Sequence, residues 1–380
     1  MAFNMGRQSL EGRLGQKLFR GGLQLGKYLG ATAVAASLLG CDHLPKPVSV
    51  SEDGRYIAYS ASESGKLQPL AESYKTATMV LYDTNEGKIV NTFEINGPPI
   101  WPTNTGDTVA YMAAPEGEVA SIREGTSVIV YSKGKRTTIE KAAYPELSSD
   151  GRYLAYTRIL NLKDPEKASD AIPLILRERR TGKERNLGVG GMAADFSPDF
   201  RSLVYITFET KDKDVRAYVE TLNLMSGQTK RLGEMNMYEG VAFANPRWIN
   251  NNGSINRVIF SGKAKEGEDS EVFIATEDGG VTQVTNNNIE EVFFGMMPDG
   301  RVSYIGVNPE EKGLSCQIAK QSLMGWTSKR NPRTVIRIAG NQAILLGDDD
   351  NLYMTPVSNL ENADESKIIS ISGRVKRQKK

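Results

Sequence analysis

Residues 144–156 read Y-P-E-L-S-S-D-G-R-Y-L-A-Y and contain the turn on which the fold prediction depends. A short extended piece leads into Asp150-Gly151, and an alternating run, residues 153–156, follows it. Asp-Gly between two such runs is typical of a β-hairpin, because Gly adopts positive φ without strain and Asp hydrogen-bonds to its own backbone. The stretch therefore predicts two adjacent antiparallel strands.

The same pattern recurs along the chain. It reads S-E-D-G-R-Y-I-A-Y in residues 51–59, S-P-D-F-R-S-L-V-Y in residues 197–205 and M-P-D-G-R-V-S-Y in residues 297–304. Weaker copies occupy residues 104–111, 251–260 and 347–353. The aromatic residues that close the copies are Tyr59, Tyr111, Tyr156, Tyr205, Phe260, Tyr304 and Tyr353. A repeat of about 40 to 50 residues that is rich in short strands predicts the blades of a β-propeller.

Each repeat unit continues with a polar connection and a second pair of strands around a tight turn, such as Lys133-Gly134 or Thr181-Gly182. Each unit is thus expected to hold four strands, the content of one blade. The prediction is an all-β β-propeller over residues 48–372, with seven blades and an incomplete last blade of three strands. Six blades followed by a C-terminal extension is the alternative.

The motif S-x-D-G-R-x-[IL]-A-Y, present in residues 51–59 and 148–156, resembles the WD-repeat-like motif of TolB-type β-propellers. Propellers of this type also accompany hydrolase domains in prolyl peptidases. The resemblance extends over most of the chain from about residue 47 to residue 372. It implies a propeller but supplies no function, because this fold carries binding, scaffolding and catalysis alike.

The first 40 residues have the composition of an export signal. They carry a net charge of +4, and residues 28–40 form an uncharged run that is too short to span a bilayer. The run ends in Leu38-Leu39-Gly40-Cys41, which resembles the bacterial lipoprotein box. The resemblance implies a signal peptide over residues 1–40 and a lipid on Cys41, with residues 41–47 as a membrane-proximal linker. A mitochondrial-type transit peptide and an ordinary buried Cys41 are the alternatives.

The membrane that would hold this anchor is left open by the sequence. Asp42 resembles the residue that retains lipoproteins in the inner membrane of enteric bacteria, but that rule varies among lineages. The expected location is the bacterial cell envelope, on the periplasmic or extracytoplasmic side of either membrane.

The charge balance argues against a nucleic-acid partner. From Cys41 onward the chain carries −3, and the basic tail of residues 373–380 carries +5, so the propeller itself stands at −8. An acidic body without a basic stripe is a poor nucleic-acid binder. We expect the tail to be disordered, with contact to anionic lipid head groups as the alternative.

The chain lacks the residue types that most catalytic sites require. Its one histidine is His43, so neither a His-rich metal cluster nor a Ser-His-Asp arrangement can form in the propeller. The second cysteine, Cys316, is expected to be a small buried residue. The acidic run of residues 348–350 could bind Ca²⁺ but is also explained as a hairpin turn. The sequence therefore predicts a non-enzyme without catalytic residues, cofactor or metal.

The motif carboxylates are expected to form turns rather than to line the central channel; they are Asp53, Asp150, Asp199 and Asp299. Long polar connections follow the motif strands, at residues 61–78, 113–126, 161–171 and 263–269. The fold would place them together on one rim, which is the expected face for a protein partner. The predicted function is a lipid-anchored docking platform in an envelope assembly. A carbohydrate-binding or carbohydrate-active propeller that uses carboxylates alone is the alternative.

Overall fold

The described strands form seven antiparallel sheets of four strands each, and every sheet consists of four strands that are consecutive in the chain. The computed structural model describes residues 48–51, 54–61, 77–95, 99–113, 126–160, 172–211, 214–235, 246–249, 257–263, 270–276, 280–285, 290–296, 302–308, 313–320, 322–325, 334–339, 342–346, 351–356, 359 and 365–371. The second strands of the sheets are buried along nearly their whole length, for example residues 56–61 and 108–113, as expected for strands that are covered on both faces.

The first four sheets cover the N-terminal part of the described chain. The first contains β1 (Val48–Val50), β2 (Tyr56–Ala61), β3 (Ala77–Asp83) and β4 (Lys88–Ile95). The second contains β5 (Pro99–Thr105), β6 (Thr108–Ala113), β7 (Ser127–Ser132) and β8 (Lys135–Glu140). The third contains β9 (Ala142–Leu147), β10 (Tyr153–Arg158), β11 (Pro173–Glu178) and β12 (Glu184–Gly190). The fourth contains β13 (Met192–Phe196), β14 (Ser202–Lys211), β15 (Asp214–Asn223) and β16 (Thr229–Met235).

Three further sheets complete the arrangement. The fifth contains β17 (Arg247–Ile249), β18 (Arg257–Lys263), β19 (Ser270–Thr276) and β20 (Val281–Gln283). The sixth contains β21 (Glu290–Met296), β22 (Val302–Asn308), β23 (Gly313–Lys320) and β24 (Ser322–Gly325). The seventh contains β25 (Thr334–Ala339), β26 (Gln342–Leu346), β27 (Leu352–Pro356) and β28 (Ile369–Ser370), with a short 3₁₀ helix, η2 (Glu365–Lys367), before β28.

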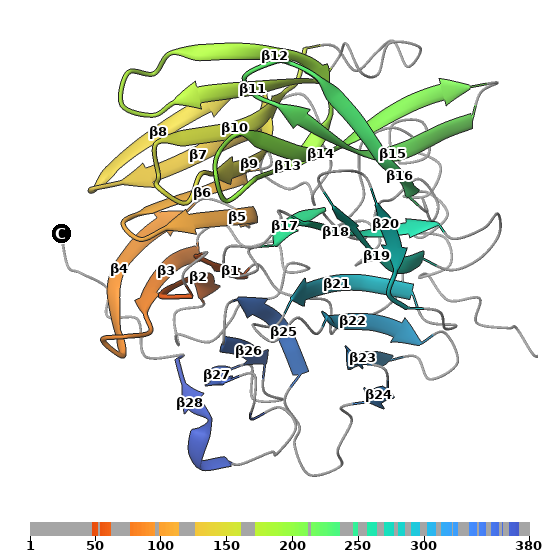
Figure 1. Ribbon diagram of the computed structural model, residues 1–380. Coiled ribbons are helices and arrows are strands. Elements are labelled where there is room, and N and C mark those ends of the chain that lie inside the picture. The colour runs from red at the N-terminus through yellow and green to blue at the C-terminus, as the bar shows by residue number, and fades with distance from the viewer. Residues whose placement is uncertain are drawn as a thin grey trace, which may run out of the picture.

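The sheets surround a common centre (Figure 1), with β1, β5, β17 and β25 nearest the middle and β4, β8, β24 and β28 farther out. The first strand of each sheet lies next to the first strand of a neighbouring sheet, and β1 lies next to both β5 and β25. The sheets therefore form a closed ring. The expected all-β β-propeller is confirmed.

The closing aromatic residues of the repeat occupy equivalent positions in the first six sheets. Those of the first five copies lie in the second strands and are the largest fully buried side chains; they are Tyr59, Tyr111, Tyr156, Tyr205 and Phe260. Tyr304 also lies in a second strand, β22. The prediction is wrong for Tyr353, which lies in the third strand β27. The reason is that residues 347–350 connect β26 to β27, not the first two strands of the sheet.

The expected incomplete last blade is also wrong, because the last sheet has four strands. Its first strand is β25, a β-branched run that begins shortly after Pro332 and supplies the strand missing from the predicted three. The last strand is short, because the chain after η2 pairs with β27 only at Ile369 and Ser370.

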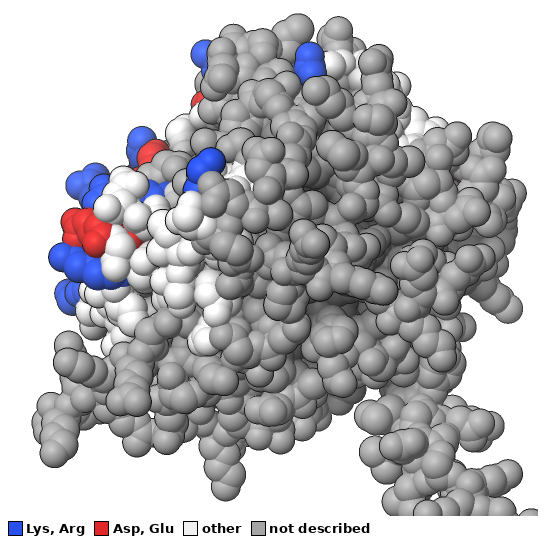
Figure 2. Space-filling view, turned by 90° about the horizontal axis from the view of Figure 1, so that it is seen from below, with Lys and Arg blue, Asp and Glu red and all other residues white. Residues whose placement is uncertain are grey.

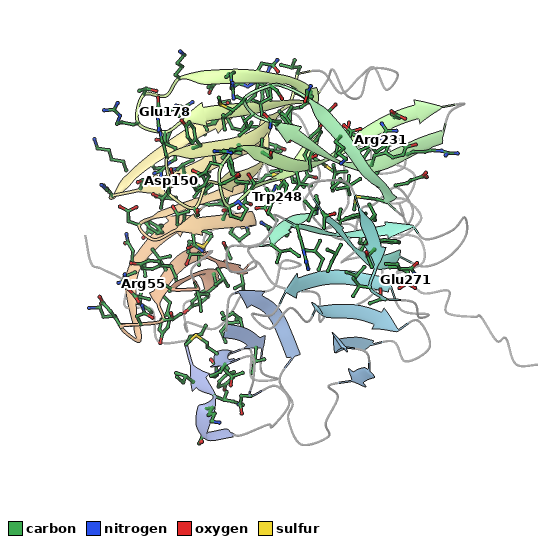
Figure 3. The ribbon with its side chains drawn as sticks, in the orientation of Figure 1. Arg55, Asp150, Glu178, Arg231, Trp248 and Glu271 are labelled. Atoms are coloured by element: carbon green, nitrogen blue, oxygen red, sulfur yellow. The ribbon has the colours of Figure 1, made fainter. Side chains whose placement is uncertain are left out.

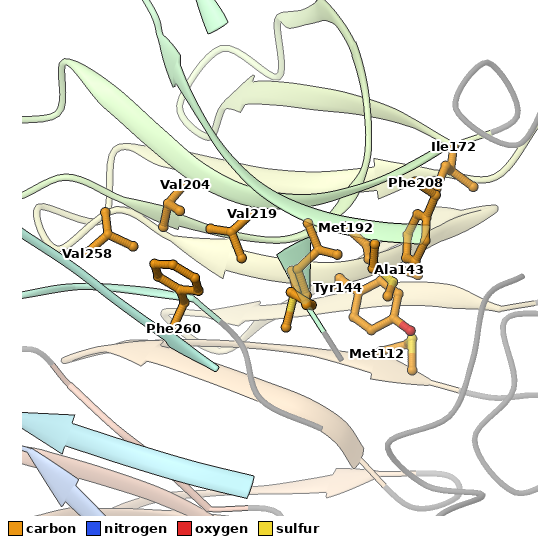
Figure 4. Close-up of a cluster of buried hydrophobic side chains, with 14 of the residues drawn as sticks. Met112, Ala143, Tyr144, Ile172, Met192, Val204, Phe208, Val219, Val258 and Phe260 are labelled. Carbon is orange, nitrogen blue, oxygen red and sulfur yellow. The ribbon is translucent and has the colours of Figure 1, made fainter. Parts of the chain in front are cut away.

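Neighbouring sheets pack through shared apolar side chains. One cluster joins four consecutive sheets (Figure 4) and contains Tyr144 of β9, Val204 and Val219 of the fourth sheet, and Phe260 of β18. These side chains are buried, so removing them from water contributes roughly 1.5–3 kcal/mol for each large one. The core thus lies between the sheets and fixes their mutual orientation.

A second cluster joins the first and last sheets. Val50 and Ile57 pack with Ile344, Leu352 and Met354, although more than 280 residues separate them in the chain. No described strand of either sheet pairs with the other sheet. Within the described part of the chain, the ring is therefore closed by side-chain packing.

Candidate functional site

The S-x-D-G-R motif forms a self-contained turn between the first two strands of a sheet. Ser148 donates a hydrogen bond from Oγ to Asp150 Oδ1 at 2.6 Å and accepts one from the Tyr153 backbone N–H at 2.8 Å. Asp150 Oδ1 also accepts from the Arg152 backbone N–H at 2.9 Å. Gly151 has φ +66°, which an L side chain rarely adopts. Asp150 is a turn former, as predicted.

A second copy of the motif has the same hydrogen bonds without the glycine. Ser197 donates to Asp199 Oδ1 at 2.7 Å and accepts from the Ser202 backbone N–H at 2.9 Å. Phe200 takes the place of the glycine and keeps a positive φ of 56°. The turn role predicted for Asp199 is therefore confirmed, whereas Asp53 and Asp299 lie outside the described residues.

The arginine of the motif ties the first turn of a sheet to the end of its third strand. Arg55 Nη2 lies 2.8 Å from Asp83 Oδ2, and Arg152 Nη2 lies 3.2 Å from Glu178 Oε1. The hydrogen bond from Arg55 lowers the pKa of Asp83 below its ordinary value. Figure 3 shows Arg55, Asp150 and Glu178 along one side of the molecule. These ion pairs therefore connect the first turn to the third strand in the first and third sheets.

A groove runs over the side of the propeller that carries these turns, and its volume is about 1340 Å³. We call it the turn-side groove. It is lined by Ser51 and Tyr56 of the first sheet, Thr105, Gly106, Asp107, Val130, Ser132, Lys133, Lys135, Thr137 and Ile139 of the second, Ser149, Asp150, Gly151, Arg152, Leu154, Arg177, Arg179 and Arg180 of the third, and Pro198 beside the fourth. The groove thus crosses four consecutive sheets.

Arg179 is the cation at the centre of the hydrogen bonds in this groove. Its guanidinium donates to the Gly151 carbonyl, to Thr108 Oγ1 at 2.8 Å and to Ser132 Oγ at 2.9 Å. All three acceptors are neutral, and no carboxylate of the described chain bonds to it. Burial lowers the pKa of Arg179, although the charge of Asp107 opposes this change. Arg179 thus joins the second and third sheets, and no carboxylate of the described chain contacts its positive charge.

The lining of the groove is strongly biased toward positive charge. Six of the lining residues are Lys or Arg and two are Asp. Within the described part of the chain, the exposed side chains of Lys135 and Arg180 make no ion pair, and Lys133 lies 3.9 Å from Asp107. Figure 2 shows described Lys and Arg side chains gathered at one edge of the molecule, beside Asp and Glu. The groove can attract an anionic group.

The centre of the propeller holds a different charged network. Arg247 Nη1 of β17 lies 3.4 Å from both Glu146 Oε2 of β9 and Asp195 Oδ1 of β13. Asp195 also accepts a hydrogen bond from the Trp248 backbone N–H at 2.7 Å, and Thr103 of β5 donates to Glu146 at 3.2 Å. Figure 3 shows Trp248 near the middle of the molecule. The network therefore ties together the central strands of four sheets.

Bulges in the central strands aim the two carboxylates toward Arg247. Tyr144 and Ala193 have positive φ, 50° and 55°, and each stands two residues before one of the acids. The register of β9 on β10 and of β13 on β14 shifts beside these residues. Such bulges re-aim the side chains that follow. Burial opposes the charge of Arg247, but Glu146 and Asp195 outweigh it and raise the pKa of Arg247.

Several predicted site residues lie outside the described chain. They are the lipid-attachment residue Cys41, the histidine His43, the acidic run 348–350 and most of each long loop of the expected partner-binding rim. Cys316 lies in β23 opposite Ile305. Among the described residues, no group of His, Cys, Asp or Glu could hold a metal ion. No described helix has the length and apolar character needed to cross a membrane.

The turn-side groove was not predicted from the sequence. The long loops after the motif strands were the predicted partner site, whereas the groove lies at the opposite strand ends, where the short turns are. A signal was present in the sequence. Lys133 and Lys135 flank Gly134 in the second turn of one unit. Three arginines come just before the corresponding turn of the next unit; they are Arg177, Arg179 and Arg180. These cations form one surface only because the second and third sheets are neighbours in the fold.

Solved structures resemble this chain at low sequence identity. An acylaminoacyl peptidase from Pyrococcus horikoshii gives a TM-score of 0.52 at 12% identity, covering 86% of this chain and 51% of that chain. TolB from Acinetobacter baumannii gives a TM-score of 0.44 at 13% identity and covers 84% of each chain. The β-propeller domain of the Trilobed protease from Pyrococcus furiosus gives 0.46 at 16% identity, covering 67% of this chain and 80% of that domain.

These comparisons bear on the fold alone. The chain spans about half the length of the Pyrococcus horikoshii peptidase, and the similarity to it supports the all-β β-propeller. No protein-family profile matches the sequence, and no curated protein matches it.

Proposed function

We propose that this protein is a non-enzymatic, extracytoplasmic β-propeller that is anchored to a bacterial membrane through a lipid on Cys41 and serves as a docking platform for protein partners in an envelope assembly. The anchor rests on the basic and apolar composition of residues 1–40 and on the sequence Leu38-Leu39-Gly40-Cys41. One lipid chain holds a protein only marginally, so the two or three chains of a bacterial lipoprotein supply stable attachment.

The docking proposal rests on which of the described charged side chains have a partner of opposite charge. The acids near the central channel, Glu146 and Asp195, are paired with Arg247. A general acid needs a raised pKa, yet hydrogen bonds and nearby arginines lower the pKa of other described acids; these are Asp83, Glu178, Glu184, Asp199 and Glu209. Among the described residues, three cations without an ion pair line the turn-side groove; they are Lys135, Arg179 and Arg180. This distribution suits binding better than acid–base catalysis.

The test is in-cell photo-crosslinking with the full chain. A photo-reactive residue is introduced at positions within 62–76 or 114–125, on the predicted loop-bearing rim, and at an exposed position far from it, Lys230, as a control. We expect one discrete adduct from the rim positions and none from Lys230. The partner is then purified, and its binding to the detergent-solubilised chain is measured directly.

A second measurement separates docking from catalysis. The purified chain is incubated with acidic and neutral polysaccharides and with peptides, and product release is followed. Release above the background of a heat-denatured sample would overturn the non-enzymatic proposal and favour a carbohydrate-active propeller. Absence of any rim adduct, together with no binary binding, would overturn the docking proposal.

A further inference from the structure

We propose that the turn-side groove binds an extended acidic segment of a partner protein. This inference rests on the proposed docking function and deepens it, because it names a second surface, on the opposite strand ends from the loop-bearing rim, and the chemistry of what binds there. The segment would lie across the second and third sheets and place its carboxylates against the cations that line the groove.

The first support is local charge. Arg179 donates its hydrogen bonds only to neutral oxygens, and Lys135 and Arg180 make no ion pair within the described chain. Each remaining cation of the groove has a carboxylate within 4 Å: Arg152 has Glu178, Arg177 has Glu184 and Lys133 has Asp107. Three cations in one groove are therefore available to an external anion. Arginine is especially suited to carboxylates because its planar guanidinium can bind both oxygens.

The second support is the size and course of the groove. Its volume of about 1340 Å³ exceeds the 300–1,000 Å³ that is usual for small-molecule pockets. It runs from Tyr56 in the first sheet to Pro198 beside the fourth, over the turns between them and along β8. Beneath the charged rim lie Val130, Ile139 and Leu154, which are almost fully buried and give the groove an apolar floor. An elongated groove of this kind fits a stretch of polypeptide better than a single small anion.

The third support concerns which occupants the charges exclude. The two ends of this chain carry +4 and +5, so neither complements a basic groove. A nucleic acid would have to extend beyond the groove over a propeller body that carries −8, and its phosphates would be repelled there. A short acidic segment meets only the local charges, because salt screens the more distant ones beyond about 8 Å.

The experiment measures binding of defined peptides to the full chain in detergent by fluorescence anisotropy. The probe is a fluorescent ten-residue peptide in which Glu and Leu alternate. Its matched control has Gln in place of every Glu. We expect the Glu peptide to bind about tenfold more tightly than the Gln peptide, and we expect this difference to shrink as NaCl is raised to about 0.5 M.

Variants of exposed residues locate the site without disturbing the fold. Lys135→Glu combined with Arg180→Glu is expected to weaken binding of the Glu peptide about tenfold. Lys183→Glu is the matched control, because Lys183 is exposed on the same sheet but does not line the groove. It should change binding less than about twofold. Thermal unfolding of each variant verifies that the propeller is intact.

Three outcomes would overturn the proposal. The Gln peptide could bind as well as the Glu peptide, the Lys183→Glu control could weaken binding as much as the double variant, or an oligogalacturonate or oligonucleotide of equal charge could compete as well as the Glu peptide. The last result would identify a general anion site. None of these outcomes affects a partner crosslinked to the loop-bearing rim, so failure here and failure of the docking function can be told apart.

Discussion

The Tyr59 hydroxyl lies 3.4 Å from the backbone carbonyl oxygen of Ile371 and donates a hydrogen bond to it across 312 residues of chain. Tyr59 belongs to β2 in the first sheet, and Ile371 directly follows the last strand of the seventh. Both residues belong to the apolar cluster that joins the two sheets. The ring is therefore closed by residues from its two extreme sheets, which makes its stability depend on the whole chain.

Replacing Ser148 by Ala should destabilise the propeller by about 1–2 kcal/mol. The buried hydroxyl of Ser148 both donates to Asp150 and accepts from the Tyr153 N–H, so its loss leaves that N–H without its partner. Ser149→Ala is the control, because Ser149 is exposed in the same turn. Urea denaturation of both variants checks the prediction, and equal effects at the two positions would contradict the turn assignment.

Gly151→Ala should cost more than Gly134→Ala, although both glycines have positive φ. A Cβ on Gly151 would lie 3.0 Å from Thr105 Oγ1 and 3.2 Å from Arg179 Nη1, whereas a Cβ on Gly134 would meet nothing within 4 Å. Backbone strain of about 1 kcal/mol is common to both, and the close approach adds to it only at Gly151. The two free energies of unfolding are compared by chemical denaturation. A larger cost at Gly134 would mean that the groove wall is not packed as described.

Arg247→Met should destabilise the protein by about 3 kcal/mol. The variant leaves Glu146 and Asp195 facing each other without the cation that now bridges them. Adding Glu146→Gln and Asp195→Asn to Arg247→Met should restore part of the loss, since the amide side chains carry no charge. Thermal unfolding of the single and triple variants tests this. A triple variant less stable than the single one would refute the assignment of the network as a compensated charge cluster.

Stability should fall in acid partly because of Asp83. Its folded-state pKa lies below the ordinary value of 3.8, chiefly because Arg55 hydrogen-bonds to the carboxylate. A lowered pKa means that the pair stabilises the fold above about pH 4 and that this stabilisation is lost as the pH falls further. Asp83→Asn should therefore unfold more easily at pH 7 and show a shallower loss of stability below about pH 4. The urea denaturation midpoints of the variant and of the unaltered protein are measured from pH 7 to pH 3. Midpoints that fall in parallel for the two proteins would contradict the prediction.

Cys41→Ser should release the protein from membranes or block its processing while the propeller stays folded. The motivation is the basic segment, the short apolar run and the box that ends at Cys41. Membrane fractionation and mass spectrometry of the N-terminal peptide supply the readout, and Cys316→Ser is the control. An unmodified Cys41 inside a longer membrane-bound chain would contradict the lipoprotein assignment.

Local patterns were enough to predict the propeller. Asp-Gly turns and buried aromatic residues such as Tyr156 and Tyr205 recur because each sheet needs the same turn and the same central packing. The pattern failed at Tyr353, because the acidic sequence that resembles the motif lies between the second and third strands of the last sheet. Short-range signals identify a hairpin but not which pair of strands it joins.

The candidate sites depend on contacts that no local pattern contains. Glu146, Asp195 and Arg247 are spread over about 100 residues and meet only because three central strands converge. The bulges that aim the two acids occur at Tyr144 and Ala193, residue types that do not favour positive φ. The groove likewise arises from turns of separate sheets. Such features follow from the closed ring and could not be predicted from residue types alone.

Because side chains of the first and last sheets close the ring, the apolar surface of the first sheet is covered only when the last sheet is present. The apolar side chains around Val50 and Ile57 can pack against their partners only after Leu352 and Met354 have been synthesised. Contacts so distant in sequence form slowly, and unfinished apolar surface promotes aggregation. The first sheet of a newly made propeller therefore keeps apolar surface uncovered until the last sheet has folded against it.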